Sequence, residues 1–213
     1  MSVTHPAALT SAPAPTAAEW AAMLTETAGL CTAVLAEASR EEDWTRPAHG
    51  LDWSCRATLD HLALGLVGYA GLLTARPTDR YIALFASLDP EAPLPARLEG
   101  IRIAAALLAA TVRGADPRDR AWHPWGHSDA TGFAAMGLVE TLVHTDDLAR
   151  GLGIGWRLPD ELCAPVLARL FPELPDDALP GHSPAETLRW ATGRGTLPGH
   201  GRRVEWAWDG TVR

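Results

Sequence analysis

Four long stretches of this 213-residue chain carry apolar residues at the spacing of amphipathic helices. In the first stretch Trp20, Met23 and Leu24 lie three and four residues apart, so they would share one helix face. Four such helices, with one extended connection among the segments that join them, are typical of a four-helix bundle. The sequence therefore predicts a mainly α protein, with helices over residues 16–42, 54–75, 93–114 and 129–150.

Local signals set the ends of these expected helices. Ser54 is a good N-cap, because its side-chain oxygen can accept a hydrogen bond from the first helical turn. Pro77 stops the same helix, since proline has no amide hydrogen to donate. Pro93 opens the third helix, and Gly151 follows the end of the fourth. These boundaries place His61 in the second turn of the second helix.

The last third of the chain has a different pattern. Short helical patterns occur near residues 159–170 and 183–192, and residues 203–208 alternate between polar and apolar as a strand does. The N-terminal residues are rich in Ala, Pro, Ser and Thr and lack an apolar period. We therefore expect a disordered leader over residues 1–15, a four-helix bundle over 16–155 and a small α+β C-terminal extension over 156–213.

Charge and cysteine content disfavour several classes of protein. The net charge is −8 and the chain has no basic run, which argues against a nucleic-acid partner. No stretch reads as a secretory signal or as a continuous apolar span of membrane length. The three cysteines are widely spaced and form no Cys-x-x-Cys pair, as expected in a reducing compartment. We expect a cytoplasmic monomer or homodimer that acts on small molecules, without membrane or nucleic-acid partners.

Glu140 and His144 are the most informative polar pair in the chain. Being four residues apart on a helix, they point from the same face, one turn apart. Their neighbours are apolar or small, so the helix is expected to be buried, and a buried carboxylate needs a partner. One interpretation is a metal site completed by His61, with an open position typical of catalytic metals. The alternative is a hydrogen-bonded Glu–His pair in the bundle core.

Other residues are candidates for a role around this pair. His123 and His127 precede the fourth helix, where a loop could supply a proton carrier or a substrate contact; the alternative is a packed, hydrogen-bonded loop. Asp147 lies one turn beyond His144 and could orient that imidazole. Tryptophans at helix edges, such as Trp53, pack the ends of the bundle or line an aromatic pocket. His127 and Asp147 are the predicted catalytic residues.

Three stretches of the chain together resemble a known family. They are residues 53–63 with Leu-Asp-His, residues 140–153 with Glu-x-x-x-His-x-x-Asp, and residues 188–194 followed by Leu-Pro-Gly at 197–199. Over roughly residues 16–208 the chain resembles the DinB-like metalloenzyme superfamily and, within it, the family of mycothiol-dependent maleylpyruvate isomerase. The resemblance implies a DinB-like four-helix bundle.

The resemblance also implies the make-up of the site. His61, Glu140 and His144 correspond to the metal ligands of the family, which hold zinc in most members, with nickel or iron as alternatives. Asp147 falls where the family has an aspartate near its low-molecular-weight thiol cofactor, such as mycothiol. Asp147 and Arg150 are therefore the expected cofactor-binding residues. The resemblance leaves open which arginine would match one that helps catalysis in the isomerase: Arg76, Arg80 or Arg97.

The function expected from these residues is that of a metal-dependent, mycothiol-dependent transferase or isomerase acting on an electrophilic small molecule. A metal would lower the pKa of the thiol and hold a nucleophile at neutral pH. Two alternatives stay open at this point. One is a thiol-independent metalloenzyme, such as a hydrolase, cyclase or isomerase of a biosynthetic pathway. The other is a stress protein that binds a small molecule or a metal without turnover.

Overall fold

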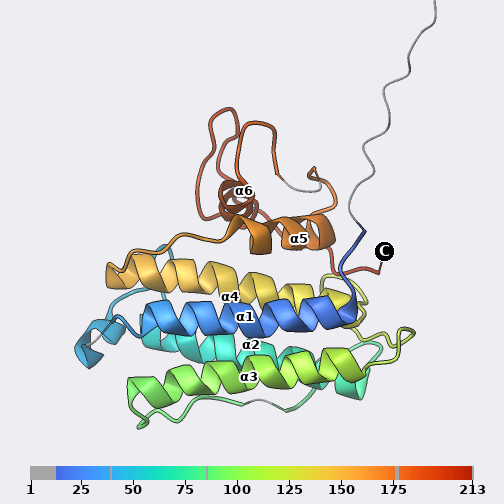
Figure 1. Ribbon diagram of the computed structural model, residues 1–213, viewed down its shortest axis with the longest axis horizontal. Coiled ribbons are helices and arrows are strands. Elements are labelled where there is room, and N and C mark those ends of the chain that lie inside the picture. Colours follow the sequence, from blue (N-terminus) through green and yellow to red (C-terminus); the bar gives the residue numbers. More distant parts are fainter. Residues whose placement is uncertain (1–12, 39, 85, 176–177, 213) are drawn as a thin grey trace, which may run out of the picture.

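The computed structural model describes residues 13–38, 40–84, 86–175 and 178–212. Its helices in chain order are α1 (Ala17–Leu35), the 3-10 helix η1 (Glu41–Thr45), α2 (Cys55–Ala75), α3 (Leu94–Gly114), α4 (Ala130–Leu152), α5 (Asp160–Leu170) and α6 (Pro184–Ala191). The four long helices run side by side (Figure 1), with α1 and α2 each packed against both α3 and α4. The predicted four-helix bundle is confirmed. Most of the predicted leader, residues 1–15, lies outside the described residues.

Side-chain caps fix the beginnings of three of the long helices. Thr16 and Glu19 form a capping box at the start of α1, in which each side chain bonds the backbone N–H of the other. The Ser54 and Asp129 side chains accept backbone hydrogen bonds at the starts of α2 and α4. Helix α1 ends at Leu35, earlier than expected from its apolar pattern, and η1 takes up part of the remainder.

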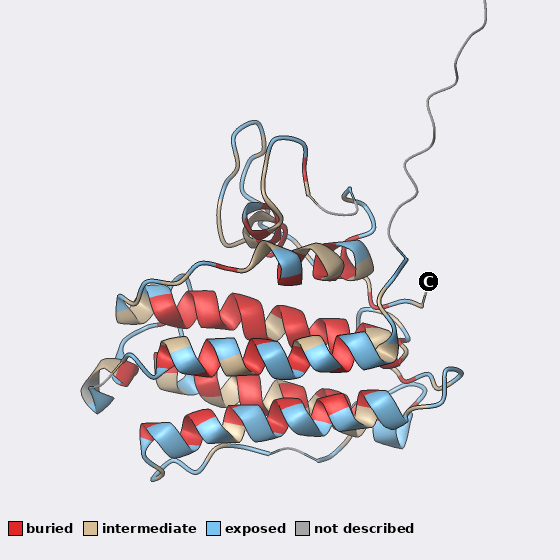
Figure 2. Cartoon of the chain, in the orientation of Figure 1, coloured by how far each residue is buried: buried red, intermediate tan, exposed pale blue. Residues whose placement is uncertain are grey.

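Helix α4 is the central element of the molecule. It is buried along almost its whole length (Figure 2), because α1 and α2 cover one side and α5 covers the other. This explains why the first half of α4 is apolar or small nearly all round, as expected for a helix with no solvent face. The extension is also fastened to α4 by an ion pair, since the Arg189 guanidinium donates to Asp146 at 2.6 Å. Polar residues on α4 are therefore held in a buried, ordered setting.

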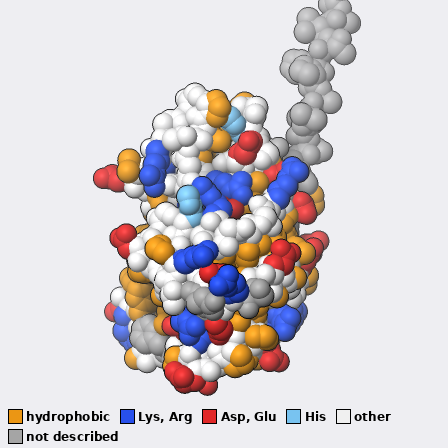
Figure 3. Space-filling view, turned by 90° about the vertical axis from the view of Figure 1, so that its left-hand side faces the viewer, with side chains coloured by type: hydrophobic (Ala, Val, Ile, Leu, Met, Phe, Trp, Pro, Cys, Tyr) orange, Lys and Arg blue, Asp and Glu red, His pale blue; other side chains and the backbone are white. Residues whose placement is uncertain are grey.

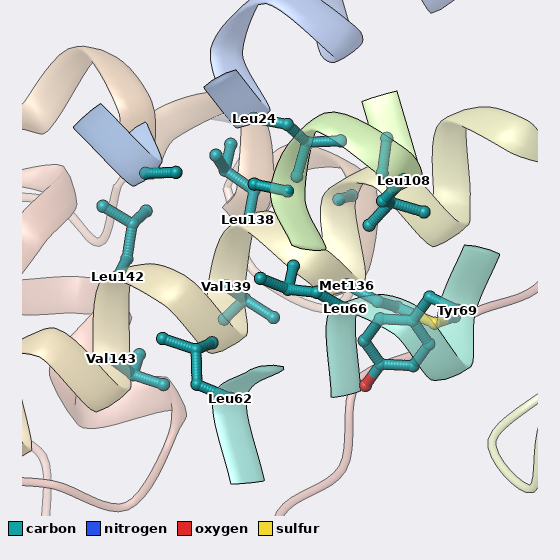
Figure 4. Packing of buried hydrophobic residues seen from close by; sticks show 14 of the residues in the cluster. Leu24, Leu62, Leu66, Tyr69, Leu108, Met136, Leu138, Val139, Leu142 and Val143 are labelled. Atoms are coloured by element: carbon teal, nitrogen blue, oxygen red, sulfur yellow. The ribbon is translucent and has the colours of Figure 1, made fainter. Parts of the chain in front are cut away.

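The core forms where leucine side chains of the four long helices meet around α4 (Figure 4). Gly137 allows this close approach, because a Cβ at that position would lie 2.5 Å from Leu108 Cδ2. The same Cβ would lie 3.1 Å from Leu24 and 3.2 Å from Leu66. Side chains from α1, α2 and α3 thus fill the space beside a single glycine of α4, in keeping with the close packing of protein interiors.

Leu66→Ala is expected to lower the free energy of unfolding by about 2–5 kcal/mol, because it removes buried methyl groups and leaves a cavity. Chemical denaturation followed by circular dichroism measures the change. The matched control is Leu107→Ala on α3, whose side chain is 52% exposed and which we expect to stay within about 0.5 kcal/mol of wild type. Equal effects of the two substitutions would contradict the packing described for α2.

The strand predicted for residues 203–208 is wrong. The described residues of the extension contain α5, α6 and irregular segments, and the single β-type contact there is an isolated bridge between Leu197 and His200. The alternation has another cause over residues 205–208, because Trp206 is half-buried and Trp208 is buried while Glu205 and Ala207 are exposed; Val204 is itself 85% exposed. An extended segment that packs one face onto the protein alternates in the same way as a strand, even without a partner strand. The expected α+β extension is therefore helical and irregular in the part that the structure describes.

By length and composition alone, α2 is apolar enough to cross a membrane. It is, however, packed against α3 and α4, and half of its most apolar window is buried inside the bundle. A core helix of a bundle needs this apolar character for packing. The composition of α2 is thus accounted for by the bundle, and it gives only weak evidence for a membrane span.

Candidate metal centre

The structure brings His61 of α2 together with Glu140 and His144 of α4. The Nε2 atom of His144 lies 2.9 Å from Glu140 Oε2, and the Nε2 atom of His61 lies 3.9 Å from the same oxygen. One ligand atom from each residue lies within 4.8 Å of the other two. The helical spacing of four aligns the two α4 residues, and the packing of α2 against α4 brings in the third.

These three atoms fit a single divalent ion. Atoms within 4.8 Å of one another have a common point no more than about 2.8 Å from each, while zinc bonds to nitrogen and oxygen measure about 2.0–2.2 Å. The side chains would therefore close by less than about 1 Å to share an ion. The donor set of two imidazoles and a carboxylate is also typical of catalytic zinc sites. The Glu140–His144 hydrogen bond, expected if the two residues form only a buried pair in the bundle core, is present as well.

Charge in the cluster favours a cation. Burial alone would raise the pKa of Glu140, but the hydrogen bond from His144 and the neighbouring imidazole charges hold that pKa below its usual value. Burial would likewise lower the pKa of His144, yet its bonds to Asp147 and Glu140 raise it to about 9. Burial lowers the pKa of His61. The carboxylates around His144 thus attract positive charge, which a proton or a metal ion can supply.

Asp147 holds the other side of the His144 ring. Its Oδ2 atom lies 3.1 Å from His144 Nδ1, and the side chain is fully buried. Arg194 of the extension donates from Nε and Nη2 to the same carboxylate, at 3.0 and 2.8 Å. A chain of contacts therefore runs from the extension through Asp147 to His144, and it fixes which ring nitrogen faces Glu140. The sequence reasoning identified Asp147 but did not single out Arg194 within the 188–194 stretch.

Tyr69 is a further member of the cluster that sequence reasoning missed. Its hydroxyl donates to Glu140 Oε1 at 3.2 Å, which leaves Oε2 facing the two histidines. Burial raises the pKa of Tyr69 well above its usual value, so the hydroxyl stays a donor. Tyr69 lies eight residues after His61 on α2, and this two-turn spacing on one helix face is the signal that could have found it.

Two other predicted site residues are not brought into the cluster. His127 is exposed, and its Nε2 lies 2.7 Å from the Thr78 carbonyl oxygen. Arg150 is exposed at the end of α4, with Nη1 3.7 Å from Asp146. His123 is instead the buried histidine of that loop, and burial lowers its pKa to about 4. It therefore carries a neutral ring at neutral pH.

Aromatic side chains border the cluster. The Trp53 ring centroid lies 4.9 Å from that of His61, and Trp53 is 47% exposed. Tyr81 is 51% exposed and stacks edge-on against Trp122 at 5.0 Å. The negative charge of Glu140 also contributes, after burial, to the raised pKa of Tyr81. Trp53 therefore places a part-exposed aromatic ring, of a kind that suits an organic ligand, against the His61 side of the cluster.

A four-helix bundle whose facing helices bring two histidines and a glutamate together fits the DinB-like fold that the sequence resembles. Comparison with protein families agrees: residues 24–149 match the model described as the mycothiol maleylpyruvate isomerase N-terminal domain. The match covers more than half of the chain and includes the cluster and Asp147, so this chain belongs to that family. No curated protein and no solved structure matches the chain.

Proposed function

We propose that this protein is a metal-dependent enzyme that uses a low-molecular-weight thiol, mycothiol by family membership, as an isomerase or transferase of an electrophilic small molecule. The observation that carries the proposal is the approach of His61, Glu140 and His144 to within 4.8 Å of one another. Zinc is the proposed ion, with nickel or iron as alternatives, because imidazole suits all three. The three free cysteines are buried, consistent with the proposed cytoplasmic location.

Each residue of the cluster has a proposed task. His61, Glu140 and His144 hold the ion, and when bound the ion lowers the pKa of a thiol so that a thiolate exists at neutral pH. Tyr69 orients Glu140 by donating to the oxygen that does not face the histidines. Asp147 orients His144 through Nδ1. Positioning of this kind is typical of metal sites, where outer hydrogen bonds fix the ligand rings.

The substrate side of the centre is proposed to be the face bordered by Trp53 and by the part-exposed His61 ring. Asp147 acts through His144 in this proposal, because Arg194 and His144 already occupy its oxygens. Arg150 remains a proposed contact for the cofactor, because it is exposed at the end of the same helix. His127 is left out of the proposed machinery, since its ring is bonded to a loop carbonyl.

The proposal is tested by the binding of mycothiol to the zinc-loaded and the chelator-treated protein, measured by calorimetry. We expect binding at least about tenfold tighter with zinc, because the thiolate gains a ligand bond only there. S-methyl mycothiol is the matched control, since it keeps the rest of the molecule but has no thiol to ionise. Equal binding of the two compounds, or equal binding with and without zinc, would mean that a metal-bound thiolate is not part of the function. Turnover of an electrophile without thiol would then favour a thiol-independent metalloenzyme.

A further inference from the structure

A cavity of about 500 Å³ lies where the bundle meets the C-terminal extension. Its walls come from the loop before α2, from Asp147 of α4 and from segments 192–196 and 202–206 of the extension. None of the three proposed metal ligands lines it. Asp147 contacts His144 at Nδ1, whereas Nε2 on the far side of the ring faces Glu140. The cavity therefore lies behind the metal centre, and a single carboxylate separates the two.

The cavity is positively charged although the chain is acidic. Arg194, Arg202 and Arg203 line it against a single carboxylate, Asp147, while the whole chain carries a net charge of −8. Figure 3 looks onto the end of the molecule at which α4 ends, where several basic side chains lie among acidic and apolar ones. A concentration of guanidinium groups around a concave wall attracts anions, because the low-dielectric walls focus the field.

One of these arginines pairs with no carboxylate among the residues that the structure describes. Arg194 is paired with Asp147, and Arg203 donates from Nη2 to Glu173 at 2.8 Å. Arg202 forms no ion pair with any residue that the structure describes, and its Nε donates to the Gly193 carbonyl at 3.2 Å. The Nη atoms of Arg202 are thus left to bind a ligand, in the fork geometry that matches carboxylate and phosphate oxygens.

Trp206 adds a donor to the cavity wall, which also contains His49 and the hydroxyls of Thr192 and Thr196. Within the described part of the chain, Trp206 Nε1 has no hydrogen-bond acceptor, and an indole N–H can only donate. Gly193 leaves room for the Trp206 ring, because a Cβ at Gly193 would lie 2.9 Å from the indole nitrogen. The Arg194 guanidinium lies 5.8 Å from the centroid of the same ring. An indole N–H donor and the Arg194 guanidinium therefore lie close together in the cavity wall.

We propose that this cavity binds a small molecule through a carboxylate or phosphate group, held by the Arg202 fork and the Trp206 N–H. The volume is within the range of small-molecule sites, about 300–1,000 Å³. The inference goes beyond the proposed function, because it needs no metal ion. The Arg194–Asp147–His144 contacts place the bound anion next to the residues that support the metal centre.

The experiment is calorimetric titration of the chelator-treated full-length protein with inorganic phosphate and, separately, with succinate. We expect one or both to bind, and Arg202→Gln to weaken binding at least about tenfold, since it removes charge-assisted hydrogen bonds. Trp206→Phe keeps an aromatic side chain, although a smaller one, and removes the N–H, so it should weaken binding about threefold or more. The matched control is Arg102→Gln, which removes one charge from an exposed arginine of α3 outside the cavity and should leave binding unchanged.

The outcomes are distinct. Binding of phosphate alone, or of succinate alone, supports the site and identifies the class of anion. Binding that is lost equally in the Arg102 and Arg202 variants reflects overall charge and overturns the site. No binding up to about 10 mM also overturns it. Binding that appears only after zinc is added places the anion on the metal, which overturns this inference while supporting the proposed metal centre.

Discussion

We expect the wild-type protein to carry about one divalent ion per chain and His144→Ala to lose most of it. The substitution removes one of three proposed ligands and leaves Glu140 and His61 as the remaining protein donors. We expect metal affinity to fall by at least about 100-fold, more than the loss typical of outer hydrogen-bond partners. Elemental analysis of desalted protein, with a chelator competition for the affinity, measures both effects.

His127→Ala is the matched control for this prediction. It makes the same substitution at an exposed histidine outside the cluster, whose ring is bonded to the Thr78 carbonyl. The control should keep the full metal content. If the wild-type protein retained no metal after treatment with zinc, the whole metal proposal would be contradicted. A His144 variant that retains its metal, together with a His127 variant that loses it, would mean that the ligand set includes the loop.

Asp147→Ala is expected to lower both the metal affinity and the stability of the protein. It removes the partner of His144 Nδ1, and loss of such a partner costs about 10–100-fold in metal affinity. It also leaves Arg194, whose side chain is 13% exposed, without its carboxylate. Breaking a buried ion pair on one side costs about 3–5 kcal/mol of unfolding free energy. Chelator competition and denaturant unfolding of the metal-free protein separate the two effects.

Two further variants show whether the Asp147 effect arises from this buried pair. Asp116→Ala removes a carboxylate from the exposed pair with Arg118 and should have little effect on stability. The double variant Asp147→Leu, Arg194→Leu removes both charges and should recover part of the lost stability but not the metal affinity. If the double variant regained full metal affinity, Asp147 would not act through His144.

Sequence alone determined much of the fold because its signals are local. The Ser54 cap and the Pro77 stop act on neighbouring backbone groups, so the bounds of α2 could be predicted without the rest of the structure. The same holds for Glu140 and His144, which a helix brings onto one face whatever surrounds it. The sequence offered His61 as the third ligand, but periodicity cannot say which helix faces meet, so only the packing of α2 against α4 shows that His61 faces the pair.

The tertiary structure decided the contacts between distant segments. Arg194 reaches Asp147 across 47 positions and Tyr69 reaches Glu140 across 71, and no local pattern reports such pairings. The prediction of a strand around Trp206 and Trp208 was wrong for the same reason. Alternating polar and apolar residues indicate that one face of a segment is buried, but a strand also needs a partner strand to pair with. Sequence thus determined the helices and the residue types available for a metal centre. The packing of α2 and of the extension onto α4 decided which of those residues meet.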